Sequence, residues 1–191
     1  MDTFVFETDL GLIAFSRRKN CLLALSFGHA TQRAAIKALT RNLKPSSSAA
    51  GWIEYECIQT EDDPLAEQLV AFAKGEPVEF EDLPVDSNHL TDFGQKVIAA
   101  CRAIPYGETR TYGQLASQAG SPGAARAVGS VMARNRVPLV VPCHRVVPAS
   151  GKLGGFSAPQ GVSMKKRLLE MENGSMAQTA NAKAVAGINR V

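Results

Sequence analysis

Apolar positions in the first part of the chain alternate over short runs that are separated by turn-forming residues. These runs predict short strands of an antiparallel sheet at residues 4–8, 12–16 and 22–27. Over residues 31–44 the apolar positions recur every three or four residues, which indicates a helix. A second helix is predicted over residues 64–74, because Asp63 can cap its first turn and Pro64 suits the first helical position.

The second part of the chain has clearer helix boundaries. Thr111 and Gln114 form a capping box for a short helix. Ser121-Pro122 is predicted to cap the next helix and to begin it at once, so that this helix runs to about Arg134. Two helices joined by a tight glycine-containing turn predict a helix-turn-helix.

Three further elements frame this helix pair. Thr91 is predicted to cap a helix that extends to about Ala103. Residues 146–147 and 153–156 flank a turn at residues 149–152 and predict a β-hairpin or wing. A last helix is expected over about 162–171.

Charge divides the 191-residue chain in two. Residues 1–89 carry 8 Lys and Arg against 14 Asp and Glu, a net charge of −6, whereas residues 90–173 carry 11 against 4, a net charge of +7. An acidic half joined to a basic half predicts two domains, the second of which meets a polyanion. The acidic segment from Glu76 to Asp86 is expected to connect them. Residues 174–191 have no strong pattern and are predicted to be a mobile tail.

The helix that ends near Arg134 has a face suited to a polyanion. Arg126, Ser130 and Arg134 recur every fourth residue, and Ala127 lies beside them. Small residues between arginines let the backbone approach closely, while the guanidinium groups reach phosphates or base edges. This face therefore predicts DNA contact; the alternative is an ordinary amphipathic helix with solvated arginines.

The chemistry that the sequence offers is concentrated in Pro142-Cys143-His144-Arg145-Val146. A cysteine is a strong nucleophile as a thiolate, and a neighbouring imidazole commonly removes the thiol proton. Adjacency alone does not show that the two side chains face each other, so a structural cysteine beside a surface histidine remains the alternative.

The other cysteines and histidines point to no further site. They are widely spaced, without a CxxC pair, at positions 21, 57, 101, 29 and 89. We expect no zinc site, no disulfides and free thiols in a reducing cytoplasm. The start of the chain shows no signal-peptide pattern, and no apolar run approaches membrane-spanning length, so no membrane association is expected.

Ordered blocks over about residues 90–173 resemble the O6-alkylguanine-DNA alkyltransferases, also called methylated-DNA–protein-cysteine methyltransferases. The matching blocks are Ile104-Pro-Tyr-Gly-Glu-Thr109, Tyr112-Gly-Gln-Leu-Ala116, Ala124-Ala-Arg-Ala-Val-Gly129, Asn135 and Pro142-Cys-His-Arg-Val146. The resemblance implies an α+β fold with two domains. These are an RNase H-like α/β domain at residues 1–89 and a winged helix-turn-helix domain with the active site at residues 90–173.

The resemblance also implies a DNA-repair reaction. The protein would flip an O6-alkylguanine out of the duplex and transfer the alkyl group irreversibly to its own Cys143, with O4-alkylthymine as a second substrate. No cofactor or metal takes part. His144 would act as the base through a water, Glu172 would orient the imidazole, and Asn135 would brace the turn before the motif.

The remaining roles implied by the resemblance concern DNA and the base pocket. Tyr112 would line the pocket and turn the backbone phosphate, and Arg126 would fill the gap in the base stack of a duplex bound through its minor groove. The pocket would be lined by Pro138, Val146, Ser157 and Lys165. We expect the protein to act as a monomer.

Two departures from the family pattern bear on this prediction. The segment at residues 157–161 is longer and less glycine-rich than in many family members, which affects the tolerance for bulky alkyl groups. The zinc ligands of some animal members have no counterpart.

Three alternatives to this prediction remain. The first is a non-catalytic alkyltransferase-like damage sensor, although such proteins replace the acceptor cysteine. The second is a winged-helix regulator that responds to alkylation. The third is a cysteine hydrolase, which would turn over.

Overall fold

The first three strands form an antiparallel meander. In the computed structural model, which describes residues 1–43, 56–57 and 63–174, they are β1 (Asp2–Phe6), β2 (Leu12–Arg18) and β3 (Cys21–His29). The prediction of three strands is confirmed, but β1 ends two residues earlier than expected. Thr8 and Gly11 exchange backbone hydrogen bonds of 3.2 and 2.9 Å, so the chain already turns at Thr8.

A short fourth strand was not predicted. Residues Glu56–Cys57 form β4, which pairs in parallel with Phe4 and Val5 of β1. The strand order is therefore β3-β2-β1-β4, with β3 at one edge. Two residues carry too little alternation to be recognised in the sequence.

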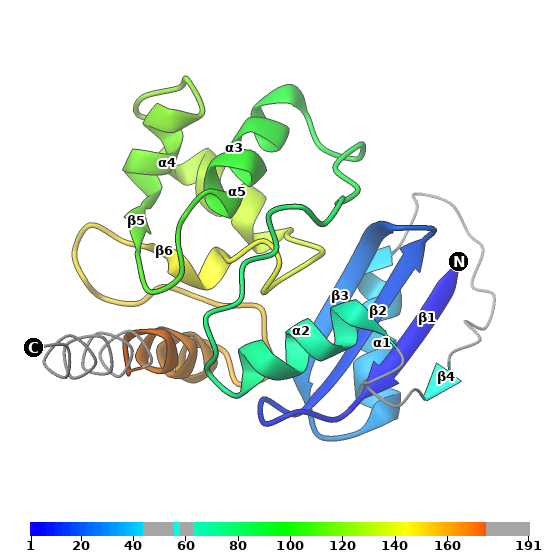
Figure 1. Cartoon of the computed structure of the whole chain (residues 1–191). Coiled ribbons are helices and arrows are strands. Elements are labelled where there is room, and N and C mark those ends of the chain that lie inside the picture. The colour runs from blue at the N-terminus through cyan, green and yellow to red at the C-terminus, as the bar shows by residue number, and fades with distance from the viewer. Residues whose placement is uncertain (44–55, 58–62, 175–191) are drawn as a thin grey trace, which may run out of the picture.

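Helices cover both faces of this sheet (Figure 1). Helix α1 (Gln32–Leu43) packs on one face through a small cluster made by Val5, Ala14, Ala24, Ala35 and Leu39. Helix α2 (Pro64–Ala73) lies on the other face, and the Asp63 side chain accepts hydrogen bonds from its first turn as predicted.

The face that carries α2 shares its hydrophobic core with the second half of the chain. One continuous cluster contains Phe15 of β2 and Phe72 of α2, and also Leu139 and Leu168 from the second half. The two halves of the chain differ in net charge, but their apolar interiors pack against each other.

The second half contains a group of helices. Helices α3 (Asp92–Arg102) and α4 (Tyr112–Gln118) begin at the predicted caps, Thr91 and Thr111, and the capping box with Gln114 is present. Helix α5 (Ala125–Ala133) packs against both of them. A last helix covers residues 162–174, so residue 174 is helical rather than part of a mobile tail. The rest of the predicted tail, residues 175–191, lies outside the described residues.

The predicted start of α5 at Ser121-Pro122 is wrong. Gly123 has φ +89°, a left-handed conformation that interrupts a right-handed helix. The Ala124 amide instead donates to the Ser121 carbonyl in a turn, and the helix begins only at Ala125 without a side-chain cap.

The predicted hairpin after Cys143 is also wrong. Val146–Val147 form β6, which pairs in parallel with β5 (Arg110–Thr111), whereas residues 153–156 form no strand. Gly154 and Gly155 lower the strand propensity of that segment, and β6 finds its partner in a distant part of the chain.

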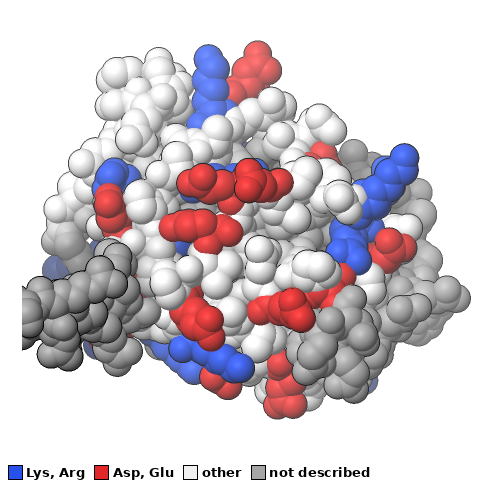
Figure 2. Space-filling model, viewed as in Figure 1, with Lys and Arg blue, Asp and Glu red and all other residues white. Residues whose placement is uncertain are grey.

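The acidic segment between α2 and α3 follows the edge of the sheet. The Leu22 amide donates to the Pro84 carbonyl at 2.8 Å, and the Asp86 amide donates to the Leu22 carbonyl at 2.9 Å. Figure 2 shows several Asp and Glu side chains near the middle of the face that is viewed there. Glu76, Glu79 and Glu81 of the acidic segment are exposed. Phosphates would be repelled here, so this face does not suit DNA.

Candidate active site

Cys143 begins a single 3-10 turn, η2 (Cys143–Arg145), that follows an irregular apolar loop. Its amide donates to the Val141 carbonyl at 2.7 Å, which holds the loop tightly against the turn. Leu139 in this loop has φ +72° and is 1 % exposed. A non-glycine residue rarely adopts such a conformation, and the surrounding packing stabilises it here.

Asn135 braces this loop from its start. Its Nδ2 donates to the Val141 carbonyl at 2.9 Å, and its Oδ1 accepts from the Val137 amide at 3.0 Å. The amide side chain therefore bonds both ends of the segment that leads to Cys143. Burial raises the pKa of the Cys143 thiol, and a hydrogen bond from Asn135 opposes part of that rise.

His144 and Glu172 are buried together in the interior. His144 Nε2 lies 2.8 Å from Glu172 Oε1, and the two side chains are 0 and 1 % exposed. Within the described part of the chain, His144 Nδ1 is the single buried side-chain nitrogen or oxygen without a hydrogen-bond partner. With the Nε2 proton donated to Glu172, the Nδ1 lone pair is available to accept a proton.

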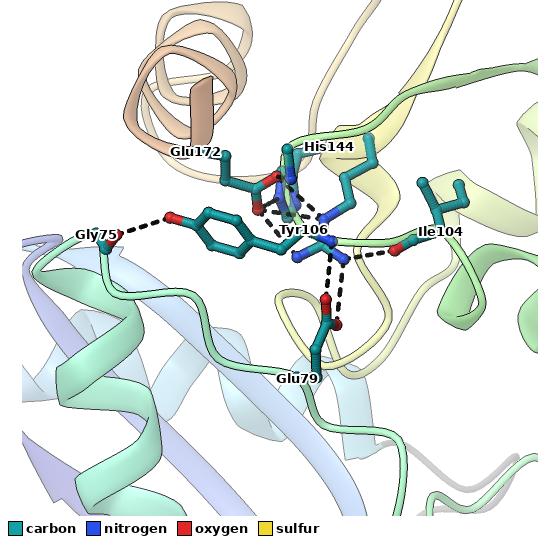
Figure 3. Close-up of polar contacts among 8 residues, drawn as sticks. Gly75, Glu79, Ile104, Tyr106, His144 and Glu172 are labelled. Carbon is teal, nitrogen blue, oxygen red and sulfur yellow. Dashed lines mark hydrogen bonds and ion pairs between the residues drawn. The ribbon is translucent and has the colours of Figure 1, made fainter. Parts of the chain in front are cut away.

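Glu172 is held by further donors in a cluster that we call the Glu172 network (Glu79, Ile104, Tyr106, Gly107, His144, Arg145 and Glu172; Figure 3). Arg145 Nε lies 3.2 and 3.1 Å from the two carboxylate oxygens, and Arg145 Nη2 lies 3.1 Å from Oε1. The Gly107 amide donates to Oε2 at 3.1 Å. A buried carboxylate with this many donors is stable as an anion.

Burial and these contacts shift three pKa values. Burial raises the pKa of the Cys143 thiol, and the Asn135 hydrogen bond and the Lys165 charge oppose that rise only in part. Burial lowers the pKa of His144, which Glu172 opposes. Burial raises the pKa of Glu172, but the hydrogen bond from His144 and the charge of Arg145 outweigh it, so the pKa falls below its ordinary value. The resting site thus holds a thiol, a neutral imidazole and a carboxylate.

Cys143 lies at a groove of about 880 Å³. Pro138 and Ser157 line this groove, as do Asn135 and Arg134. Cys143 is 8 % exposed, so its approach from solvent is narrow. The structure thereby brings Cys143, Pro138 and Ser157 to one opening.

Lys165 and Val146 do not line this groove. Lys165 is 1 % exposed, and its Nζ donates to the Val146 carbonyl at 2.6 Å. The ammonium group also lies 5.9 Å from the ring centroid of Tyr112, the first residue of α4. Burial raises the pKa of Tyr112, and the neighbouring Cys143 raises it further, so Tyr112, Lys165 and Cys143 share one environment.

The arginine face of α5 is separate from this buried cluster. Arg126, Ala127, Ser130 and Arg134 are exposed. The Arg134 Nε donates to the Ser130 carbonyl at 3.1 Å, so this arginine lies along its own helix. Of these four residues, Arg134 alone lines the groove at Cys143.

The sequence analysis gave no role to Arg145, Gly107 or Glu79. Arg145 stands inside the motif around Cys143 and Gly107 inside the matching block at residues 104–109, which were the available signals, whereas nothing local marks Glu79. Among the described residues, no group of three or more His, Cys, Asp or Glu could hold a metal ion, and no helix is long and apolar enough to cross a bilayer.

The fold and the site thus define a mixed α/β protein with a buried cysteine, histidine and glutamate beside a pair of packed helices. A family model described as "6-O-methylguanine DNA methyltransferase, DNA binding domain" matches residues 92–174. A methylated-DNA–protein-cysteine methyltransferase of Mycobacterium leprae is 41% identical over 145 residues, which are 76% of this chain and 82% of the relative. The chain belongs to the methylated-DNA–protein-cysteine methyltransferase family.

Other relatives agree with this assignment. The protein of that name from Mycobacterium tuberculosis is 51% identical over 106 residues, which are 56% of this chain and 62% of the relative. The crystal structure of Mycobacterium tuberculosis OGT in complex with DNA has a TM-score of 0.70 and 34% sequence identity, and covers 92% of this chain and 94% of that chain. The mixed α/β fold is therefore that of a solved DNA-bound relative.

Proposed function

We propose that this protein repairs DNA by transferring a methyl or other alkyl group from O6-alkylguanine to Cys143. The observation that carries the proposal is a cysteine that lines the groove and is followed in the chain by a buried histidine, whose Nε2 is bonded to Glu172 and whose Nδ1 has no hydrogen-bond partner among the described residues. The family membership supports the same reaction. Alkylthymine is a second substrate of the proposed activity.

In the proposed reaction the thiol proton leaves through His144, and the sulfur attacks the alkyl carbon. The S–C bond forms as the bond from that carbon to O6 breaks, and the electron pair and a proton go to guanine, which is restored. Glu172 stabilises the imidazolium formed in this step. A thioether offers no route back to the thiol, so each protein molecule reacts once.

DNA binding is proposed to use α4 and α5 as the helix-turn-helix of a basic domain at residues 90–173, next to an RNase H-like domain at residues 1–89. Arg126, Ala127, Ser130 and Arg134 would face the minor groove, and Arg126 would replace the flipped base. Tyr112, Pro138, Val146, Ser157 and Lys165 would surround that base, with Asn135 bracing the loop. A stacked base is out of reach of Cys143, so flipping is required. Monomeric state and cytoplasmic location stay predictions.

The decisive experiment mixes the protein with a duplex that contains one O6-methylguanine and follows both products. We expect one methyl group per protein, located on the peptide that contains Cys143, and unmodified guanine in the DNA. A damage sensor or a regulator that binds without reacting would leave both masses unchanged, and a cysteine hydrolase would turn over many lesions. Methylation of Cys21, Cys57 or Cys101 would contradict the assignment.

A further inference from the structure

Glu79 lies on the acidic segment after α2, outside the part of the chain that the family model matches. It nevertheless makes two contacts with other residues of the Glu172 network. Its Oε1 accepts a hydrogen bond from the Tyr106 amide at 2.8 Å, and its Oε2 lies 3.7 Å from Arg145 Nη1. Figure 3 shows Glu79 directed from this segment towards the cluster around Glu172.

The hydrogen bond from the Tyr106 amide to Glu79 fixes a turn that itself donates a hydrogen bond to Glu172. Tyr106 is followed by Gly107, whose amide donates to Glu172 Oε2 at 3.1 Å. The Tyr106 hydroxyl also donates to the Gly75 carbonyl at 2.9 Å, at the end of α2. Glu79 therefore holds the turn at its backbone and Gly75 holds it at its side chain, and the turn supplies one of the donors that orient the carboxylate.

The second contact concerns the guanidinium of Arg145. This group is 3 % exposed and contacts Glu172, the Ile104 carbonyl at 2.6 Å from Nη1, and Glu79, and its Cζ lies 5.5 Å from the ring centroid of Tyr106. Because the guanidinium is planar and rigid, the position of Nη1 determines where Nε and Nη2 meet Glu172. Glu79 is 43 % exposed, so solvent weakens this ion pair and the hydrogen bond to Tyr106 is the stronger constraint.

We propose that Glu79 is a positioning residue for the reaction of Cys143, through which the first half of the chain orients Glu172 and thereby His144. The inference rests on the proposed function, since it assigns Glu79 to the same site. It gives the first half of the chain a part in the chemistry in addition to its part in the shared core.

Two substitutions separate the contacts. Glu79→Gln keeps an oxygen that can accept from the Tyr106 amide but removes the charge beside Arg145, whereas Glu79→Ala removes both. Glu76→Gln is the matched control, because Glu76 is an exposed glutamate on the same segment outside the Glu172 network. Each variant is studied as the full chain, and its melting temperature is measured so that rates are compared at equal folded fraction.

The first readout is the single-turnover transfer rate on O6-methylguanine duplex, together with the affinity for that duplex. We expect Glu79→Ala to slow transfer by about tenfold, Glu79→Gln by about threefold or less, and Glu76→Gln not at all, with affinities unchanged, because a misplaced base costs rate rather than binding. If Glu79→Ala slowed transfer only through a general loss of stability, glutamine at this position would not be expected to restore the transfer rate.

The second readout needs no methylated DNA. The rate at which iodoacetamide modifies Cys143, mapped by peptide mass spectrometry, is measured against pH in every variant. We expect the rise of this rate to move to higher pH in Glu79→Ala, because a misoriented His144 takes the thiol proton less readily, while Glu79→Gln moves less.

The two readouts fail in different ways. If the unmutated protein does not transfer a methyl group, the proposed function is wrong, and the iodoacetamide profile still reports on Glu79. If Glu79→Ala matches the unmutated protein in that profile, or if its slower transfer is accounted for by unfolding alone, Glu79 has no positioning role.

Discussion

The buried cluster around Cys143 and the exposed face of α5 hold their polar groups in opposite ways. His144, Arg145 and Glu172 are at most 3 % exposed and are fixed by one another. Arg126 and Arg134 are exposed, and salt screens their charges. The comparison teaches that reaction rate and DNA affinity belong to different parts of the molecule and can be changed separately.

The sharpest separation is expected from Cys143→Ser. Serine keeps the size of the side chain but lacks a thiol, so transfer should be abolished, whereas affinity for duplex DNA should stay within about twofold because α5 does not use the thiol. Mass spectrometry of the protein and a binding titration measure the two quantities. A large loss of affinity would show that the two regions are not independent.

In His144→Gln, we expect the transfer rate to depend directly on the raised pKa of the Cys143 thiol. Without an internal base, the thiolate fraction rises about tenfold per pH unit until the pH reaches the pKa of the thiol. This pKa is raised above its ordinary value of 9.0. Transfer should therefore be slowed by about 10²-fold or more at pH 7 and should recover steadily as the pH is raised. If the transfer rate of the variant is constant between pH 7 and 9, His144 has no part in the proton transfer.

Glu172→Gln tests how far the buried cluster stabilises the folded protein. The change leaves Arg145 buried without its anionic partner, which costs about 3–5 kcal/mol in typical buried pairs. We expect a lower melting temperature and a transfer rate that falls more than affinity does. Because the folded pKa of Glu172 is lowered, the stability it provides is present above its unfolded pKa and is lost as the pH falls through the folded value. Acid unfolding should thus be less steep in the variant, and equal steepness would contradict the assigned shift.

The smallest effects are expected from Arg126→Ala, which tests the exposed face. If Arg126 contacts only phosphate, affinity for all DNA falls alike and the salt dependence decreases by about one ion. If it replaces the flipped base, transfer from O6-methylguanine opposite cytosine should fall further than transfer opposite thymine, because a mispaired base leaves the stack more easily. Single-turnover rates on the two duplexes, with Arg134→Ala as control, distinguish these outcomes.

Local signals in the sequence determined most helix boundaries. Asp63, Thr91 and Thr111 cap their helices where expected, because a capping side chain bonds amides only two or three residues away. The motif around Cys143 likewise marked the site and its family without any structure. Such features depend on neighbours in the chain and can be read from it directly.

Only the tertiary structure decided how distant segments meet. The pairing of β6 with β5 and the two contacts of Glu79 depend on residues far apart in sequence. The sequence placed Glu172 near the end of a helix by resemblance, but its burial with Arg145 follows from the packing of that helix on the core. Long-range contacts leave no periodic or local signature, because their partners are chosen by the packing of the whole chain.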